Sequence, residues 1–177
     1  MHTLRERITA RIALLARPRV PETLPVKLDR RRVYVVPTRF GLFFTALLFA
    51  MLLGALNYNN NPALLLALLL GATGLASLIA AHLQLSGLRV DALSAEPVAA
   101  GTSLQVHVAL SAGDARARRG LQLRAADVQT TVPALTSEAV VAALEVETHQ
   151  RGWLDLGRLR ISSTQPLGLA FAWSWVW

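Results

Sequence analysis

The feature that most constrains this chain is a run of 49 consecutive residues, 40–88, that contains no Asp, Glu, Lys or Arg. The run divides into two apolar stretches, 41–56 and 63–81. At about 1.5 Å per residue, the second stretch would span roughly 28 Å as a helix, close to the thickness of the bilayer core. Neither stretch offers a helical face suited to water. The sequence therefore predicts two membrane spans, at about 40–57 and 63–81, rather than a buried hairpin of a soluble protein or a cleaved signal peptide.

The segment between the two stretches predicts a tight turn between helices. It gathers residues that favour turns and helix starts, namely Asn57, Asn59, Asn60, Asn61 and Pro62. Asn tolerates a left-handed backbone after the first helix. We expect Asn61 to cap the second helix and Pro62 to occupy its first position.

Small residues recur at every fourth position in both predicted spans. The rows are Ala46, Ala50 and Gly54 in the first span, and Ala63, Ala67 and Gly71 in the second. Small side chains let helix backbones approach closely. We therefore predict that the two rows face each other across the hairpin.

The formal net charge of +7 lies entirely before the first span. Residues 1–39 hold ten basic and three acidic side chains, whereas residues 89–177 hold eight of each. The arginines closest to the first span are Arg30, Arg31, Arg32 and Arg39. By the positive-inside rule they place the N-terminus and residues 89–177 in the cytoplasm, and the turn in the periplasm. A neutral folded region argues against nucleic acid as a partner.

Residues 1–39 are predicted to form a basic cytoplasmic arm. Within residues 3–16, Leu4, Ile8, Ile12 and Leu15 are spaced as on one face of a helix. This spacing is consistent with a basic amphipathic helix that rests on anionic lipid. A solvated, flexible arm explains the same residues equally well. An organellar transit peptide is a third reading of an Arg-rich, acid-poor stretch.

Beyond residue 88 the apolar period changes to the alternation typical of strands. Alternating residues occupy 104–110, 121–124 and 140–146, and a further run over 154–161 shifts by one residue at Gly157-Arg158, which suggests a bulge or tight turn. The predicted fold is therefore an α+β membrane protein. A transmembrane helical hairpin at 40–82 precedes a small antiparallel, Ig-like β-sandwich at 88–177, which we expect to be incomplete.

Tryptophan is concentrated near the end of the chain. Trp173, Trp175 and Trp177 alternate, so a strand would place all three on one face. Together with Trp153 they form a candidate interaction face, since tryptophan is enriched at binding hot spots. Burial in the core or against another domain is the competing interpretation.

No catalytic, cofactor-binding or metal site is predicted. The chain has no Cys, and none of its four His residues has a second ligand at metal-binding spacing. No charged side chain lies within the spans to carry a proton or ion.

Several segments together resemble the N-terminal part of bacterial membrane proteins with a domain of unknown function 58. They are VYVVPTRFG at 33–41, GALNYNN at 54–60, RGWL at 151–154, LGRLR at 156–160, PLGL at 166–169 and AWSW at 172–175. The resemblance implies a two-span anchor followed by a β-sandwich, and in longer members a von Willebrand factor A-like domain comes next. It also implies partners, namely a MoxR-type AAA+ ATPase or a transglutaminase-like membrane protein. Ala170-Phe171 replaces the usual Phe-Arg after PLGL.

The functional prediction is a non-catalytic accessory or assembly protein of the bacterial inner membrane, which binds the bilayer and a protein partner and needs no cofactor. The alternative is a subunit of an oligomeric channel or transporter. That alternative needs polar residues facing a path, and the spans offer Thr45, Thr73 and Ser77.

Overall fold

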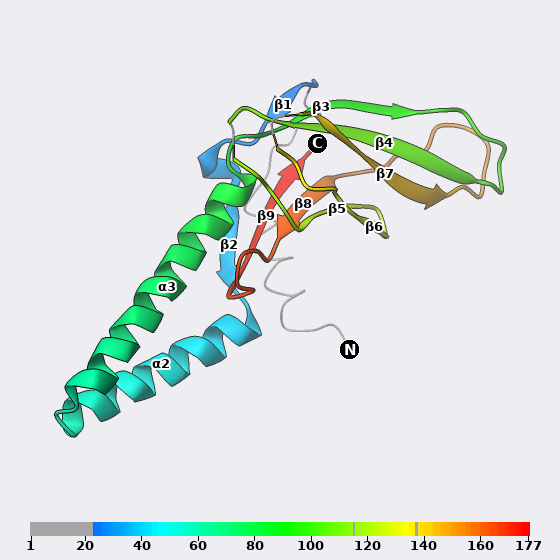
Figure 1. Cartoon of the computed structure of the whole chain (residues 1–177). Helices are drawn as coiled ribbons and strands as arrows, with labels where there is room; N and C mark the ends of the chain where they lie inside the picture. Colours follow the sequence, from blue (N-terminus) through cyan, green and yellow to red (C-terminus); the bar gives the residue numbers. More distant parts are fainter. Residues whose placement is uncertain (1–22, 115, 137) are drawn as a thin grey trace.

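In a computed structural model that describes residues 23–114, 116–136 and 138–177, two long helices extend from one side of a β-domain (Figure 1). The fold is α+β, with a helix pair and two antiparallel sheets, as the sequence predicts. The amphipathic helix predicted over residues 3–16 lies outside the described residues.

Helices α2 (Arg39–Asn57) and α3 (Asn61–Leu85) coincide with the two apolar stretches, and both are long and apolar enough to cross a membrane. Only 11% of the most apolar stretch of each helix is buried within the protein. Large side chains point outward: Phe43, Leu65 and Leu69 are 64%, 70% and 62% exposed. The core helix of a soluble protein hides such side chains, so this pair leaves a wide apolar surface uncovered.

The residue that caps the second helix lies one position earlier than predicted. Asn57 ends α2, and Asn59 adopts a left-handed backbone with φ of 49°. Asn60, rather than Asn61, caps α3, because its side chain accepts a hydrogen bond of 3.1 Å from the backbone N–H three residues on. Pro62 is the second residue of α3 rather than the first, and it fits there because backbone N–H groups of the first turn have no partner within the helix.

The two helices meet along large side chains of α2 and small residues of α3. A Cβ atom added at Gly71 would lie 3.4 Å from Leu48, and one added at Gly74 would lie 3.1 Å from Phe44. Ala67, one turn before Gly71, is buried. The α3 contact is therefore a row of small residues that accepts the bulky side chains of α2.

The predicted row on α2 does not lie against α3. Ala46 and Ala50 are exposed, and a Cβ atom at Gly54 would meet no atom within 4 Å. Two positions four residues apart differ by about 40° around the helix axis. A row of such positions therefore turns away from a neighbouring straight helix within two or three turns. Phe44 and Leu48 of α2 form the contact with α3 instead. From the row predicted on α3, Ala67 and Gly71 lie at this contact.

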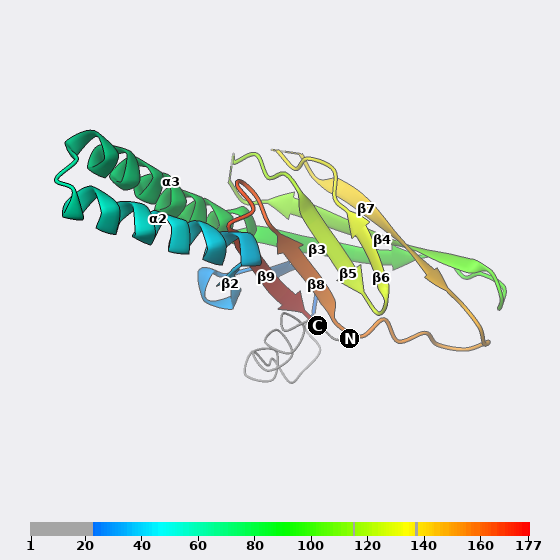
Figure 2. The same cartoon turned by 90° about the horizontal axis from the view of Figure 1, so that it is seen from below.

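The β-domain consists of two antiparallel sheets (Figure 2). The first has the order β1-β3-β4-β7, with β1 (Val26–Lys27), β3 (Leu88–Ala95), β4 (Ser103–Ala112) and β7 (Val140–Glu147). The second has the order β2-β9-β8-β5-β6, with β2 (Tyr34–Pro37), β9 (Ala170–Val176), β8 (Leu159–Ser163), β5 (Leu121–Ala125) and β6 (Val128–Thr131).

The alternating runs at 104–110, 121–124 and 140–146 form β4, β5 and β7, which confirms those predicted strands. The run at 154–161 is only partly a strand. Residues 148–158 are irregular, Gly157 has φ of 63°, and β8 begins at Leu159. The one-residue shift in the pattern therefore marks the entry to a strand rather than a bulge within one.

Two strands come from residues 1–39, which were predicted to form only a basic arm. Strand β1 pairs with β3, and β2 pairs with β9, so that Tyr34 lies opposite Trp173. The β-domain thus begins before the helices rather than at residue 88, and the helix pair is inserted between β2 and β3. With two and four residues, β1 and β2 are too short to show the alternation that reveals a strand.

The end of α3 is built into the core of the β-domain. Ala81 and Leu85 are 1% and 0% exposed. They belong to one buried cluster with Val90 of the first sheet and with Ile161 and Ala172 of the second. The second apolar helix and the β-domain therefore share one core.

The start of α2 is fixed to the loop between β8 and β9. The hydroxyl of Thr38 accepts a hydrogen bond from the N–H of Gly41 at 3.0 Å and donates one to the carbonyl of Gly168 at 2.6 Å. The N–H of Thr38 donates to the carbonyl of Leu169 at 2.9 Å. Gly41 lies so close to Leu169 that an added Cβ atom would collide with its carbonyl.

We expect Gly41→Ala to destabilise the protein by about 1–3 kcal/mol, because the new methyl group meets backbone that cannot rotate away. Gly54→Ala is the matched control in the same helix. It adds a methyl group in open space and should stabilise by roughly 0.5–1 kcal/mol. Thermal unfolding of both variants in detergent checks the expectation, and equal effects of the two substitutions would contradict it.

Candidate functional site

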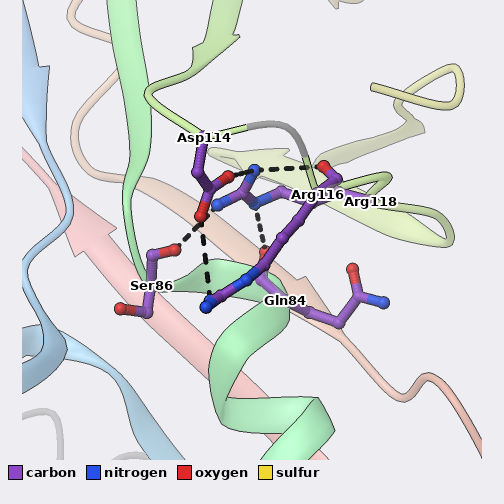
Figure 3. Close-up of polar contacts among 5 residues, drawn as sticks. All are labelled: Gln84, Ser86, Asp114, Arg116 and Arg118. Carbon is purple, nitrogen blue, oxygen red and sulfur yellow. Dashed lines mark hydrogen bonds and ion pairs between the residues drawn. The ribbon is translucent and has the colours of Figure 1, made fainter. Parts of the chain in front are cut away.

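A buried arginine joins the end of α3 to the β-domain (Figure 3). Arg118 lies between β4 and β5 and is 0% exposed. Its Nε donates to the carbonyl of Gln84 at 3.0 Å, and its Nη2 donates to the carbonyl of Ser86 at 2.8 Å. Its Nη1 donates to a carboxylate oxygen of Asp114 at 2.6 Å and to the carbonyl of Arg116 at 3.4 Å. We call Arg118, Asp114 and the carbonyls of Gln84 and Ser86 the Arg118 cluster.

The backbone of Arg118 forms a further link. Its N–H donates to the carbonyl of Leu135 at 2.7 Å, and the N–H of Leu135 donates back at 2.9 Å. One residue therefore ties together the end of α3, the connection between β4 and β5, and the connection between β6 and β7.

The Arg118 cluster stabilises the buried C-terminal end of α3 electrostatically. The last carbonyls of a helix have no partner within it and carry partial negative charge, which is costly where water is excluded. The guanidinium group supplies donors and positive charge to the carbonyls of Gln84 and Ser86. Asp114 balances that positive charge at the outer side of the cluster, where its side chain is 36% exposed.

The same contact shifts the titration of Asp114. The hydrogen bond from Arg118 lowers the pKa of Asp114 from its ordinary 3.8, although partial burial raises it. The charges of Arg118 and Arg116 lower the pKa further, with Arg116 lying 3.7 Å away. The pair stabilises the fold fully above the ordinary pKa of the carboxyl group. That contribution is lost as the pH falls through the lowered pKa.

A polar cleft of about 550 Å³ opens beside the Arg118 cluster. Its lining comes from the start of the β-domain, the end of α3 and the β4–β5 connection: Lys27, Leu28, Asp29, Arg30, Arg31, Ser86, Gly87, Asp114 and Arg116. Four of these side chains are basic and two are acidic. The excess of positive charge favours anions in the cleft.

The arginines predicted to set membrane orientation lie at the ends of the helices nearest the β-domain. Arg30, Arg31 and Arg32 form a 3-10 turn between β1 and β2, and Arg39 is the first residue of α2. Arg30, Arg31 and Arg39 are exposed, whereas Arg32 is half-buried. The turn at the far end of the helix pair carries Asn57, Asn59, Asn60 and Asn61.

The predicted tryptophan face is only partly assembled. The indoles of β9 lie on the face of the sheet opposite Ala172 and Val176, which are part of the core. Trp173 is 1% exposed, and its ring centroid lies 5.8 Å from that of Tyr34 and 5.5 Å from that of Phe171. Trp173 therefore serves packing and is closed to an incoming partner.

Arginines of the neighbouring strand region cover the other two indoles. The guanidinium carbon of Arg158 lies 4.4 Å from the ring centre of Trp177, and that of Arg160 lies 5.9 Å from the ring of Trp175. Such cation–π contacts bind cationic side chains to aromatic faces. Trp175 and Trp177 are half-buried.

Trp153 stands apart from the other tryptophans. It lies in the irregular segment between β7 and β8 and is fully exposed, with a relative accessibility of 105%. The next residue, Leu154, is 45% exposed. Of the four predicted residues, Trp153 alone presents its whole side chain to solvent.

The three polar residues that a path through the helices would need are Thr45, Thr73 and Ser77. The hydroxyl of Thr45 donates to the carbonyl of Gly41 at 2.8 Å, and that of Thr73 donates to the carbonyl of Leu69 at 2.9 Å. Ser77 is 3% exposed. These contacts leave the two threonine hydroxyls bonded to their own helices rather than to a polar path.

We expect Arg118→Ala to destabilise the protein by about 3–5 kcal/mol, because the helix-end carbonyls and Asp114 lose a buried cationic partner. Arg116→Ala is the matched control, since Arg116 also pairs with Asp114 but its side chain is 52% exposed. Its cost should stay below about 1 kcal/mol. Denaturant unfolding of the purified variants distinguishes the two, and a mild effect of Arg118→Ala would show that the cluster does not hold α3 in place.

Comparisons with protein-family models, with curated proteins and with solved structures found no match for this chain.

Proposed function

We propose that the protein is a non-catalytic accessory protein of the bacterial inner membrane, in which the helix pair anchors a β-domain that binds another protein. The observation that carries this proposal is that the two ends of α3 lie in different environments. Most of its apolar surface is uncovered, whereas its last two turns belong to the core of the β-domain. A helix of this kind joins a membrane anchor rigidly to a folded domain.

The uncovered surface supports insertion into a bilayer. Both helices are long enough to cross the hydrocarbon core, and large apolar side chains cover their outer faces. In water this surface would drive aggregation. In lipid it needs no further partner, because the backbone groups between the two ends of a helix bond to one another.

The distribution of arginines supports a cytoplasmic β-domain. Arg30, Arg31 and Arg39 lie at the helix ends next to the β-domain, and the opposite turn carries Asn and Pro. Basic residues flanking short spans remain on the cytoplasmic side. We therefore infer that the turn is periplasmic and that both the N-terminus and the β-domain are cytoplasmic.

We interpret the two sheets as an Ig-like sandwich that presents Trp153 and Leu154 to a protein partner. An isolated, fully exposed Trp beside an exposed Leu has the composition of a binding hot spot. By the resemblance noted above, the partner is a MoxR-type AAA+ ATPase or a transglutaminase-like membrane protein. Residues 89–177, which include Trp153 and Leu154, carry no net charge, so recognition at this surface relies on shape and apolar contact.

Reporter fusions test the membrane topology. A fusion after Asn60 should report a periplasmic location, and a fusion after Trp177 should report a cytoplasmic one, because of the arginines beside α2. Replacing Arg30, Arg31 and Arg39 with Gln should weaken that preference. A periplasmic signal after Trp177 would refute the proposed orientation, and recovery of the full chain in the soluble fraction would refute insertion.

Trp153→Ala tests the proposed binding surface. We expect the affinity for a MoxR-type AAA+ ATPase from the same genome to fall by about tenfold or more, while the unfolding temperature stays unchanged. Trp173→Ala is the contrasting variant and should destabilise the fold by about 3–5 kcal/mol, because that indole is buried. Binding is measured with the detergent-purified chain immobilised. Undiminished binding by Trp153→Ala would exclude the Trp153 surface.

A further inference from the structure

An apolar groove of about 610 Å³ lies where α3 enters the β-domain. One wall is formed by the end of α3, and the other by the 3-10 turn and β2. Its lining residues are Arg30, Val35, Pro37, Leu78, Ile79, His82 and Leu83. Most of the lining is aliphatic, and its two polar members, Arg30 and His82, both carry nitrogen donors.

The register between the two helices places this groove at the edge of the hydrocarbon core of the proposed membrane. Gly74 lies beside Phe44 and Gly71 beside Leu48, so the antiparallel pair brings Arg39 level with about Ile79. Arg39 marks the start of the first apolar helix and hence the edge of the hydrocarbon core. Leu78 and Ile79 therefore lie at the acyl side of that edge, and His82 lies one helical turn beyond it.

The apolar floor of the groove is continuous with the surface that the proposal assigns to lipid. Leu78 and Ile79 are 39% and 55% exposed, and Leu75, one turn earlier on α3, is 60% exposed. An acyl chain lying along Leu75 and Leu78 would enter the groove without leaving an apolar environment.

The head of the groove offers charge complementarity to a phosphate. Arg30 is exposed and its guanidinium group donates up to five hydrogen bonds to anionic oxygens. His82, in the last turn of α3, lines the same groove and supplies a ring N–H even when neutral. Among the described residues that line the groove, none carries a carboxylate.

We propose that this groove binds one anionic phospholipid of the cytoplasmic leaflet, with its phosphate held by Arg30 and His82 and one acyl chain against Leu78 and Ile79. The inference rests on the proposed membrane anchoring. The bound lipid would fill the space between α3 and β2, and so fix the height of the β-domain above the bilayer surface.

Native mass spectrometry of the detergent-purified full chain tests the proposal. Phosphatidylglycerol should bind about tenfold more tightly than phosphatidylcholine, because only the former carries a net negative charge. Arg30→Gln combined with His82→Gln should remove that preference. Arg31→Gln is the matched control. It deletes the same charge one residue away, lines the polar cleft rather than the groove, and should change the affinity by less than about twofold.

Three outcomes would overturn the proposal. They are equal binding of the two lipids by the wild-type chain, equal losses in Arg31→Gln and the double variant, and displacement of the lipid by soluble glycerol phosphate, which would indicate a site for a free anion. If the double variant does not fold, Arg30→Gln alone carries the test, because that side chain is exposed. The topology fusions keep the two proposals separable: a chain that inserts correctly but shows no lipid preference refutes the groove alone.

Discussion

The structure depends on the burial of a helix end. Helix α3 has an uncovered apolar surface over most of its length and ends inside a domain core, where Ala81 and Leu85 belong to a buried cluster with residues of both sheets. Its last carbonyls would be unpaired there, and an unpaired buried carbonyl costs about as much as a hydrogen bond is worth. Arg118 reduces this cost by donating to the carbonyl of Gln84 in the last turn and to that of Ser86, the residue that follows the helix. Without such a group, these carbonyls would lack a buried donor, which lowers the stability of the packed helix end.

The insertion of the helix pair between β2 and β3 attaches the pair to the β-domain at two points. At one, Thr38 bonds the start of α2 to the β8–β9 connection. At the other, the Arg118 cluster bonds the end of α3 to the β4–β5 connection. Strands on both sides of the inserted pair belong to the same domain, so both helices enter and leave one rigid body. A hairpin preceding a separate domain would have only one connection and could swing.

The sequence predicts the parts of this arrangement that depend on local pattern. The uncharged run, the Asn-rich turn and the alternation in β4, β5 and β7 are all local, and each corresponds to an observed element. The rest depends on contacts between distant segments. Strands β1 and β2 are too short to alternate visibly and exist because β3 and β9 pair with them. Arg118 is one of eight basic residues after the helices, and nothing near it in sequence reveals that Gln84 and Ser86 will be its partners.

The contacts of the arginines differ between the residues before the helices and those after them. Beyond residue 88, several positive side chains contact other groups of the β-domain, whereas Arg119, Arg124 and Arg151 are exposed. Arg118 is buried, Arg158 and Arg160 lie over indole rings, and Arg89 pairs with Asp91 at 3.7 Å. Before the helices, Arg30 and Arg31 remain exposed beside the end of α3. The same residue type therefore contributes to the fold after the helix pair, at Arg118, Arg158 and Arg160, and is exposed beside the end of α3 before it. A chain with net charge spread evenly over its β-domain would lose this distinction, because arginines that contact the domain's own aromatic rings and carbonyls could not also remain exposed beside the helix pair.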